Sequence, residues 1–317
     1  MPRLLASIRR DCVGLDMTSF SSLPKRPVSR RRFLKAGLYG AAALALYAGE
    51  VERHWTEVTH LDIALPRLPR AFDGMRIAQL SDIHLEKFTE PFYLRHAVHK
   101  VNQMQPEAVF LTGDYVSEGF VSNAFARRAA WTCGSILSKL ECKSVYAILG
   151  NHDVAVGERE VTAALRGHGI TVLRNASLPI ERSGGRFWLA GIDDPVWGHP
   201  YPELAIPPAI RNIPDEPVVL LCHAPDYADD LLADPIGKAI GLMLSGHTHG
   251  GQVRVPGLGA VALPEMGKKY IQGSFRLGNM QLYVNRGLGT VGLPFRFNCP
   301  PEITLFTLRA GQVPESG

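Results

Sequence analysis

Histidine, aspartate and asparagine recur in five short segments of the chain, most of them beside glycine. The segments are "DIH" (82–84), "GD" (113–114), "GNHD" (150–153), "CHAP" (222–225) and "GHTHGG" (246–251). Carboxylates, imidazoles and an amide oxygen together suit divalent ions that are neither very hard nor very soft. Two such ions held roughly 3.5–4 Å apart clamp a phosphoryl oxygen and a bridging hydroxide together. The residue types therefore indicate a dinuclear centre suited to phosphoester hydrolysis.

Each segment alone has a simpler explanation. "GNHD" (150–153) is a common turn sequence in which Asn and Asp cap nearby amides. His223 could be a hydrogen-bonded histidine of the core, and "DIH" (82–84) could cap the next helix. Only the joint occurrence of the five segments favours metal binding over these alternatives.

The segments end short apolar runs that are typical of buried strands. These runs are 75–82, 107–114, 144–153, 187–194, 217–225 and 240–250. Helical patterns lie at 91–104, 121–140 and 158–168, and two later runs, 281–287 and 302–310, read as antiparallel strands. Ligands bind at the carboxyl ends of strands in open α/β sheets, so we expect the polar residues to meet at one sheet edge. The pattern predicts an α/β sandwich of two sheets covered by helices.

Local geometry supports pairs of ligands within a segment. Asp82 and His84 are two residues apart, and such residues face the same way in extended backbone. Gly246, Gly250 and Gly251 flank His247 and His249, which indicates a tight turn without side chains crowding the ions.

In this order the five segments resemble the signature of calcineurin-like metallophosphoesterases, over roughly residues 58–308. The leader, the "FDGMRIAQLSDIHL" entry and the "NRGLGTVGLPFRFNCPPEITLFTL" ending resemble the small twin-arginine-exported bacterial phosphodiesterases of that superfamily. The resemblance implies a four-layer αββα sandwich of two mixed β-sheets flanked by helices, with the catalytic domain at 56–310.

The resemblance also implies two sets of metal ligands. The first ion would be held by Asp82, His84, Asp114 and His249. The second would be held by Asp114 (bridging), Asn151, His223 and His247. The family uses a histidine at the position of His84 in members that contain manganese or iron, so manganese is the first choice, with iron or zinc as alternatives.

By the same resemblance, His152 is the general acid and Asp153 orients it. Arg286 would meet the substrate phosphate, or be a surface arginine. Asp193 and Asp194 end an apolar run and are either structural or supports of the site.

The implied reaction is hydrolysis of a phosphodiester, nucleotide- or lipid-linked, by a metal-bridging hydroxide with His152 as acid. One alternative is a UDP-diacylglucosamine-type pyrophosphate hydrolase. Another is a non-catalytic, exported metal-binding protein of the cell envelope. An intact His152–Asp153 pair argues against the last, since a metal store needs no acid.

The N-terminal segment, 1–50, reads as an extension with a twin-arginine export signal. "SRRRFLK" (29–35) is followed by the uncharged run 36–49, which is shorter than the ~20 residues of a membrane-spanning helix. The sequence predicts recognition by the twin-arginine translocation machinery and a location in the periplasm or on the outer face of the cytoplasmic membrane. Cleavage at Ala43-Leu44-Ala45 or retention as a membrane tether are both open, as is a translation start at Met17 instead of Met1.

Charge and cysteine content exclude other classes. Nine of the 34 Lys and Arg and two of the 30 Asp and Glu lie in residues 1–35, so this segment carries +7 and the remainder −3. An acidic body removes the bulk-charge argument for binding nucleic acid. The five cysteines are too few for a disulfide framework, and Cys133 and Cys142 are either a pair or free thiols. We expect a monomer with a flexible tail at 311–317.

Overall fold

The computed structural model describes residues 29–85, 90–119, 122–213 and 216–311. The chain divides into two compact units, Met1–Ala43 and Leu44–Gly317. The alternative start sites and nearly all of the predicted tail lie outside the described residues, as do the first 28 residues of the predicted extension. Across the described ranges, no helix combines the length and the apolar character needed to cross a bilayer.

Helix α1 (Arg30–Leu46) contains most of the described part of the predicted extension and buries none of its residues. A π-helix (Tyr47–Val51) and a 3-10 helix (Glu52–His54) follow, and both belong to the larger unit. The Ala48 carbonyl accepts a hydrogen bond from the Arg296 N–H at 3.0 Å, and Glu52 Oε1 accepts one from the Cys299 N–H at 2.7 Å. The compact unit thus begins before residue 56, where the catalytic domain was expected to start.

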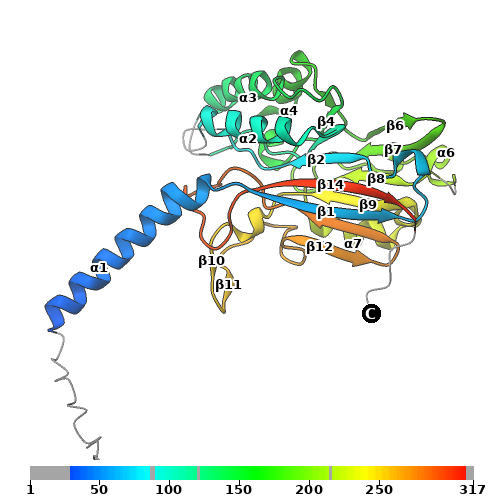
Figure 1. Cartoon of the computed structure of the whole chain (residues 1–317). Coiled ribbons are helices and arrows are strands. Elements are labelled where there is room, and N and C mark those ends of the chain that lie inside the picture. The colour runs from blue at the N-terminus through cyan, green and yellow to red at the C-terminus, as the bar shows by residue number, and fades with distance from the viewer. Residues whose placement is uncertain (1–28, 86–89, 120–121, 214–215, 312–317) are drawn as a thin grey trace, which may run out of the picture. The chain divides into compact units, whose positions relative to one another are not determined.

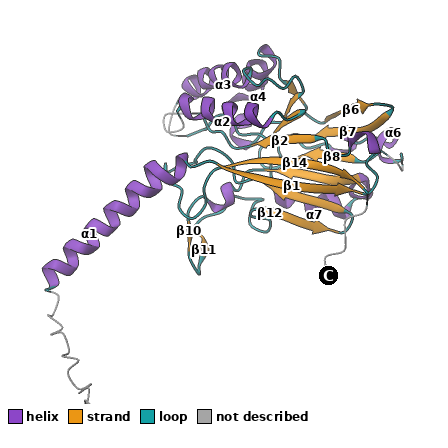
Figure 2. Cartoon of the chain, in the orientation of Figure 1, coloured by secondary structure: helices purple, strands orange, loops and turns teal. Residues whose placement is uncertain are grey.

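The first sheet has the strand order β1-β14-β2-β3-β4-β5. Figures 1 and 2 show β1, β14 and β2 side by side in this order. Its strands are β1 (Glu57–Leu65), β14 (Glu302–Ala310), β2 (Arg76–Leu80), β3 (Ala108–Leu111), β4 (Val145–Ala147) and β5 (Thr171–Val172). Every neighbouring pair is parallel except β14 and β2. The strands β2, β3 and β4 confirm three of the predicted apolar runs.

Three helices cover the outer face of this sheet: α2 (Pro91–Met104), α3 (Asn123–Leu137) and α4 (Asn151–Gly167). Helix α2 has the predicted bounds, because Pro91 suits the first turn and Leu94, Ala97, Val98 and Val101 form a buried stripe. Helix α4 begins seven residues earlier than the expected 158. The helix is interrupted at Gly157 (φ 140°), so only its second part has an uninterrupted helical pattern.

The second sheet has the order β12-β13-β9-β8-β7-β6. Its strands are β12 (Gly273–Leu277), β13 (Met280–Val284), β9 (Ile240–Ser245), β8 (Val218–Leu221), β7 (Gly185–Gly191) and β6 (Ala176–Arg182). A separate pair, β10 (Arg254–Val255) and β11 (Gly259–Ala260), forms a small hairpin beside it. The runs 281–287 and 302–310 each have one antiparallel neighbour, β12 and β2, but they lie in different sheets and do not pair with each other.

The two sheets pack face to face around a buried apolar layer. Phe72, just before β2, meets Phe187 of β7 edge-on with ring centroids 4.9 Å apart. Short helices, among them α7 (Ala228–Ala233), cover the outer face of the second sheet. The predicted αββα sandwich of two mixed sheets flanked by helices is confirmed. The carboxyl ends of five strands lie at the same edge of the sandwich, and the polar segments follow there. These strands are β2, β3, β4, β8 and β9.

Candidate metal centre

The loops after five strands bring together every residue that the sequence assigned to metal. Asp82 and His84 follow β2, Asp114 follows β3, Asn151 opens α4 after β4, His223 follows β8, and His247 and His249 follow β9. All seven side chains are buried, with exposed fractions of 8% or less. A buried set of carboxylates and imidazoles is stable only when its members are paired or bind an ion.

The backbone at these residues is unusual. Asp82, His84, Asp114, His247 and His249 all have φ between 46° and 71°, in the left-handed region. Residues other than glycine rarely adopt this conformation, and it clusters at functional sites. The expectation that Asp82 and His84 converge through extended backbone is therefore wrong. β2 ends at Leu80, and the left-handed turns after it bring the two side chains together.

Glycines make room for two of the carboxylates. A Cβ atom on Gly150 would overlap the Asp114 carboxylate, and one on Gly246 would overlap the side chains of Ser81 and Asp82. Gly246 was expected to keep side chains away from the ions, and here it makes room for the side chain of the candidate ligand Asp82. Gly250 instead faces Gln272, Cys299 and Arg286, away from the ligand cluster.

The first cluster contains Asp82, His84 and His249. The Nε2 atoms of His84 and His249 lie 3.0 Å apart, and His249 Nε2 lies 3.4 Å from Asp82 Oδ1. His84 Nδ1 is hydrogen-bonded to Ser117 Oγ at 2.9 Å. This bond fixes the ring and leaves Nε2 directed at the cluster, as partners of metal-binding histidines commonly do.

The second cluster contains Asp114, His223 and His247. His223 Nδ1 donates to the Thr112 carbonyl at 2.7 Å, and His247 Nε2 donates to the Glu265 carbonyl at 2.6 Å. Because a neutral imidazole carries one proton, these bonds leave His223 Nε2 and His247 Nδ1 as lone-pair donors. Asp114 Oδ2 lies 3.1 Å from His223 Nε2 and 3.5 Å from His84 Nε2, between the two clusters.

One buried atom of the site lacks a hydrogen-bond partner: Asn151 Oδ1 is inaccessible to solvent and accepts no hydrogen bond. The equally buried His223 Nε2 faces the Asp114 carboxylate at 3.1 Å. Buried polar atoms are nearly always satisfied, so such atoms call for an explanation such as a bound ion. The amide oxygen, the imidazole nitrogens and the carboxylates form the mixed donor set that borderline divalent metals prefer. The residues therefore fit bound metal.

The ionisation states of three of the four histidines suit metal ligands, while His223 is held as a cation by the facing carboxylates. Burial lowers the pKa of His84, His247 and His249, that of His247 to about 4, so these rings are neutral and free to bind metal. Burial alone would lower the pKa of His223, but the facing Asp114 and Asp82 carboxylates raise it well above its usual value. Burial alone would raise the pKa of Asp114, but His223 and His152 hold it well below its usual range.

His152 lies at the edge of the cluster and is half-buried. Its Nδ1 accepts a hydrogen bond from the Glu118 N–H at 3.2 Å, so the proton of the neutral ring is on Nε2. Its ring is 4.9 Å from that of His84 and 6.4 Å from that of Trp197, between centroids.

Asp194 Oδ2 accepts hydrogen bonds from the N–H groups of Val196 and Trp197, which gives Asp194 a role in shaping the loop that carries Trp197.

Asp153 contacts the backbone of the site and not the ring of His152. Its carboxylate accepts hydrogen bonds from the N–H groups of Gly150, Asp114 and Tyr115. At the third position of α4 it also suits the positive end of the helix dipole. The sequence predicted that Asp153 orients His152. The structure instead assigns its carboxylate to the two loops that bear Asn151 and Asp114.

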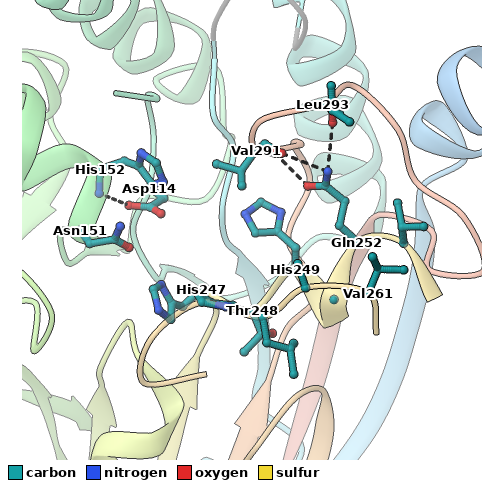
Figure 3. Close-up of a pocket in the computed structure, with 15 residues that line it drawn as sticks. Asp114, Asn151, His152, His247, Thr248, His249, Gln252, Val261, Val291 and Leu293 are labelled. Atoms are coloured by element: carbon teal, nitrogen blue, oxygen red, sulfur yellow. Dashed lines mark hydrogen bonds between the residues drawn. The ribbon is translucent and has the colours of Figure 1, made fainter. Parts of the chain in front are cut away.

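Four of the seven candidate ligands line a cavity of about 470 Å³ (Figure 3). Asp114, Asn151, His152, His247 and His249 line it. Gln252 and a group of apolar residues that includes Val261, Val291 and Leu293 complete the lining, away from Asn151 and His152.

Comparisons with known proteins agree with this geometry. The family model of the calcineurin-like phosphoesterases matches residues 75–251. The chain belongs to the calcineurin-like phosphoesterase family. It is 34% identical to the uncharacterised metallophosphoesterase YkuE of Bacillus subtilis, over 90% of this chain and 99% of that protein. It is also 34% identical to the phosphodiesterase YaeI of Escherichia coli, over 89% of this chain and 99% of that protein.

A more distant relative has a named lipid substrate. The UDP-2,3-diacylglucosamine pyrophosphatase LpxG of Chlamydia muridarum is 25% identical over 82% of this chain and 91% of that protein. Membership in the calcineurin-like phosphoesterase family confirms the resemblance seen in the sequence and the expectation of a phosphoester hydrolase.

Arg286 does not line the cavity, in contrast to its predicted contact with substrate. Its Nε is 3.0 Å from Glu302 Oε2 and its Nη2 is 2.9 Å from Glu57 Oε2. Two carboxylates thus offset the positive charge of Arg286, and the Arg286 side chain is only 15% exposed. The alternative that Arg286 is an exposed surface arginine does not agree with this low exposure either.

Arg296 is a site residue that sequence reasoning missed. It is fully buried, and its guanidinium donates to the carbonyls of Gly289, Cys299, Arg286 and Gly287. One of its nitrogens, Nη2, is 3.4 Å from His249 Nδ1. A charged residue between two aromatic residues, as in "FRF" (295–297), was the available signal in the sequence.

Proposed function

We propose that this calcineurin-like phosphoesterase is a phosphodiesterase that works with two divalent ions. The position of Asp114 Oδ2 between the two histidine clusters supports this proposal most directly. Asp82, His84, Asp114 and His249 would hold one ion. Asp114, Asn151, His223 and His247 would hold the other, and this set includes Asn151, whose buried Oδ1 atom has no hydrogen-bond partner.

Two bound ions would lower the pKa of a water and offset the negative charge of the phosphoryl oxygens. The chain supplies the remaining requirements. Left-handed backbone and the bonds to Ser117, Thr112 and Glu265 hold the ligands in place, so little reorganisation is needed when substrate binds. Because the cluster is buried, little water screens its charges. The effective dielectric constant is therefore lower than in solvent, and electrostatic interactions are stronger.

His152 is the proposed acid. Its Nδ1 accepts from the Glu118 N–H, so Nε2–H is available to donate a hydrogen bond to the departing alkoxide. Full proton transfer requires the imidazolium form, because a neutral imidazole is a very weak acid, and a proton on Nδ1 would break the bond from the Glu118 N–H.

Manganese is the first choice of metal, with iron or zinc as alternatives, because the ligands combine oxygen and nitrogen donors. Reconstitution of metal-free protein with each ion, followed by measurement of bound metal and of hydrolysis of bis(4-nitrophenyl) phosphate, tests this choice. Two ions per chain with hydrolysis greatest for manganese is the expected result. Full loading without hydrolysis of any monoester, diester or nucleotide diester would reject the phosphodiesterase.

A second candidate is hydrolysis of a UDP-diacylglucosamine-type pyrophosphate bond. The similarity to LpxG, which spans most of both chains, favours it. The two candidates differ in the bond cleaved, so product analysis by phosphorus-31 NMR distinguishes them.

Export by the twin-arginine pathway is part of the proposal. The "SRRRFLK" stretch (29–35) supports it, as does the advantage of acquiring metal before translocation. We place the protein in the periplasm or at the outer face of the cytoplasmic membrane, in association with the membrane surface, as a monomer that does not bind nucleic acid. Replacement of Arg30 and Arg31 by lysine should retain the protein in the cytoplasm, and unchanged export of this variant would refute the pathway.

A further inference from the structure

The cavity beside the metal centre has an apolar wall that the proposed chemistry does not use. Its residues are Val253, Val261, Ala262, Leu263, Pro264, Val291 and Leu293. In Figure 3, Val261, Val291 and Leu293 lie across the cavity from Asn151 and His152. The volume of about 470 Å³ falls within the range of roughly 300–1,000 Å³ for small-molecule sites. The space therefore exceeds what a phosphoryl group needs.

Gln252 holds the two halves of this wall together. Its Nε2 donates to the carbonyls of Val291 and Leu293 at 3.1 and 3.0 Å. Its Oε1 accepts from the Val291 N–H at 2.8 Å. These bonds direct both N–H groups of the amide and one of its two acceptor lone pairs at one loop, so the loop and the 252–264 segment form one pre-built surface.

The rim of the wall is exposed although it is apolar. Val261 and Leu293 are each 66% exposed, and they come from opposite sides of the Gln252 contact. Exposed apolar side chains that flank a pocket mark ligand-binding grooves. An apolar part of a substrate would cover both residues while its phosphate lies at the metal centre.

The chemistry of the wall selects among possible substrates. Its seven side chains are aliphatic, and neither a tryptophan, tyrosine or phenylalanine nor a lysine or arginine is among the described residues that line the cavity. Proteins bind bases largely by stacking on aromatic rings, which this wall cannot offer. An aliphatic chain matches the wall and gains from every methylene that it buries.

We propose that this wall binds the alkyl or acyl chain of the substrate, so that the enzyme acts on phosphodiesters with an aliphatic chain on one ester. The inference rests on the proposed phosphodiesterase function and specifies its substrate class. The phosphate lies at the metal centre, and the chain extends between Val261 and Leu293 toward solvent.

A series of 4-nitrophenyl alkyl phosphodiesters, from methyl to octyl, tests the inference below the micelle concentration. We expect kcat/KM of the manganese-loaded protein to rise with chain length, by up to about fourfold for each fully buried methylene. Val261→Asp and Leu293→Asp should flatten this dependence. Leu258→Asp is the matched control. Leu258 lies between β10 and β11, just before Val261, and is 85% exposed, but it does not line the cavity.

Direct binding of methyl to octyl phosphate, measured by titration calorimetry, gives a readout that needs no turnover. Affinity that rises with chain length in wild type and in Leu258→Asp, but not in Val261→Asp, supports the wall. Equal binding of all chain lengths, an equal loss in Leu258→Asp, or faster hydrolysis of a thymidine ester than of the octyl ester overturns it. Chain-dependent binding without hydrolysis of any ester would leave the wall standing and reject the phosphodiesterase.

Discussion

The carboxylate of Asp153, in the first turn of α4, accepts a hydrogen bond at 2.7 Å from the backbone N–H of Asp114, in the loop after β3. Asp114 is the residue whose carboxylate lies between the two histidine clusters. Asp153 also accepts from Gly150 and Tyr115, so it joins the loop after β3 to the start of α4. The position of the shared ligand therefore depends on a residue that would not itself bind metal.

Asp153→Asn should weaken both the fold and the metal site. An amide has one acceptor oxygen, and its NH2 group would face backbone donors, so at least one buried N–H loses its partner at a cost of about 1–3 kcal/mol. Loss of such a support typically lowers metal affinity about 10–100-fold. Urea unfolding and manganese titration measure the two effects. Asp73→Asn, which alters an exposed bond to Ala310, is the control, and equal effects of both substitutions would contradict this role.

His152→Ala should retain both metal ions but reduce turnover by about 10²–10⁴-fold, because proton donation to the leaving group is lost. The loss should be larger for a phenyl ester than for a 4-nitrophenyl ester, whose leaving group needs less protonation. His99→Ala on the exposed face of α2 is the control. Reduced metal content with an equal loss for both esters would show that His152 is a metal ligand instead. Unchanged hydrolysis of the 4-nitrophenyl ester would reject the acid role.

Apolar runs and the rule that ligands gather at strand ends were enough to predict the two-sheet sandwich and the set of residues at one edge. Helix α2 was predictable to the residue, because Pro91 and the apolar stripe are local signals. The place of β14 was not, because it pairs with β1 and β2, which are more than two hundred residues away in sequence. Long-range pairing of this kind depends on the assembled core.

The detailed site geometry was beyond sequence reasoning for a similar reason. Left-handed backbone at Asp82 and His84 is unfavourable locally and persists only because the surrounding loops impose it. The burial of Arg296 and the pairing of Arg286 with Glu302 arise from segments that meet only in the folded state. The candidate ligands could be predicted from the sequence, but the backbone conformation and the buried arginines that hold them in place could not.

Arg296→Leu should destabilise the protein by about 2 kcal/mol or more, because several buried carbonyls lose their donor. Arg296→Lys keeps the charge but cannot reproduce the planar fork, so it should recover only part of the loss. Thermal unfolding of both variants, with the exposed Arg276→Leu as control, measures this. A melting temperature for Arg296→Leu equal to that of the control would contradict a structural role for the guanidinium.

Glu302 should contribute stability at neutral pH that disappears in acid. Burial alone would raise the pKa of Glu302, but Arg286 and the Tyr283 O–H hold it below its usual value. A lowered pKa in the folded state stabilises the fold above the ordinary glutamate pKa of about 4.3, and this stability is lost as the pH falls through the folded value. Glu302→Gln should therefore cost about 1–3 kcal/mol at pH 7 and less near pH 3.5. Urea unfolding at both pH values checks this, and a cost independent of pH would contradict it; exposed Glu141→Gln is the control.

Removal of metal should lower stability through Asn151, whose buried Oδ1 atom has no hydrogen-bond partner. Manganese at a hundred times its dissociation constant should restore about 2.7 kcal/mol for each independent site. Asn151→Ala deletes one ligand, so manganese should stabilise this variant less than wild type. Thermal unfolding of chelator-treated protein with and without manganese measures the difference, with the exposed Asn123→Ala as control. Equal stabilisation of Asn151→Ala and wild type would show that the Asn151 oxygen does not bind the ion.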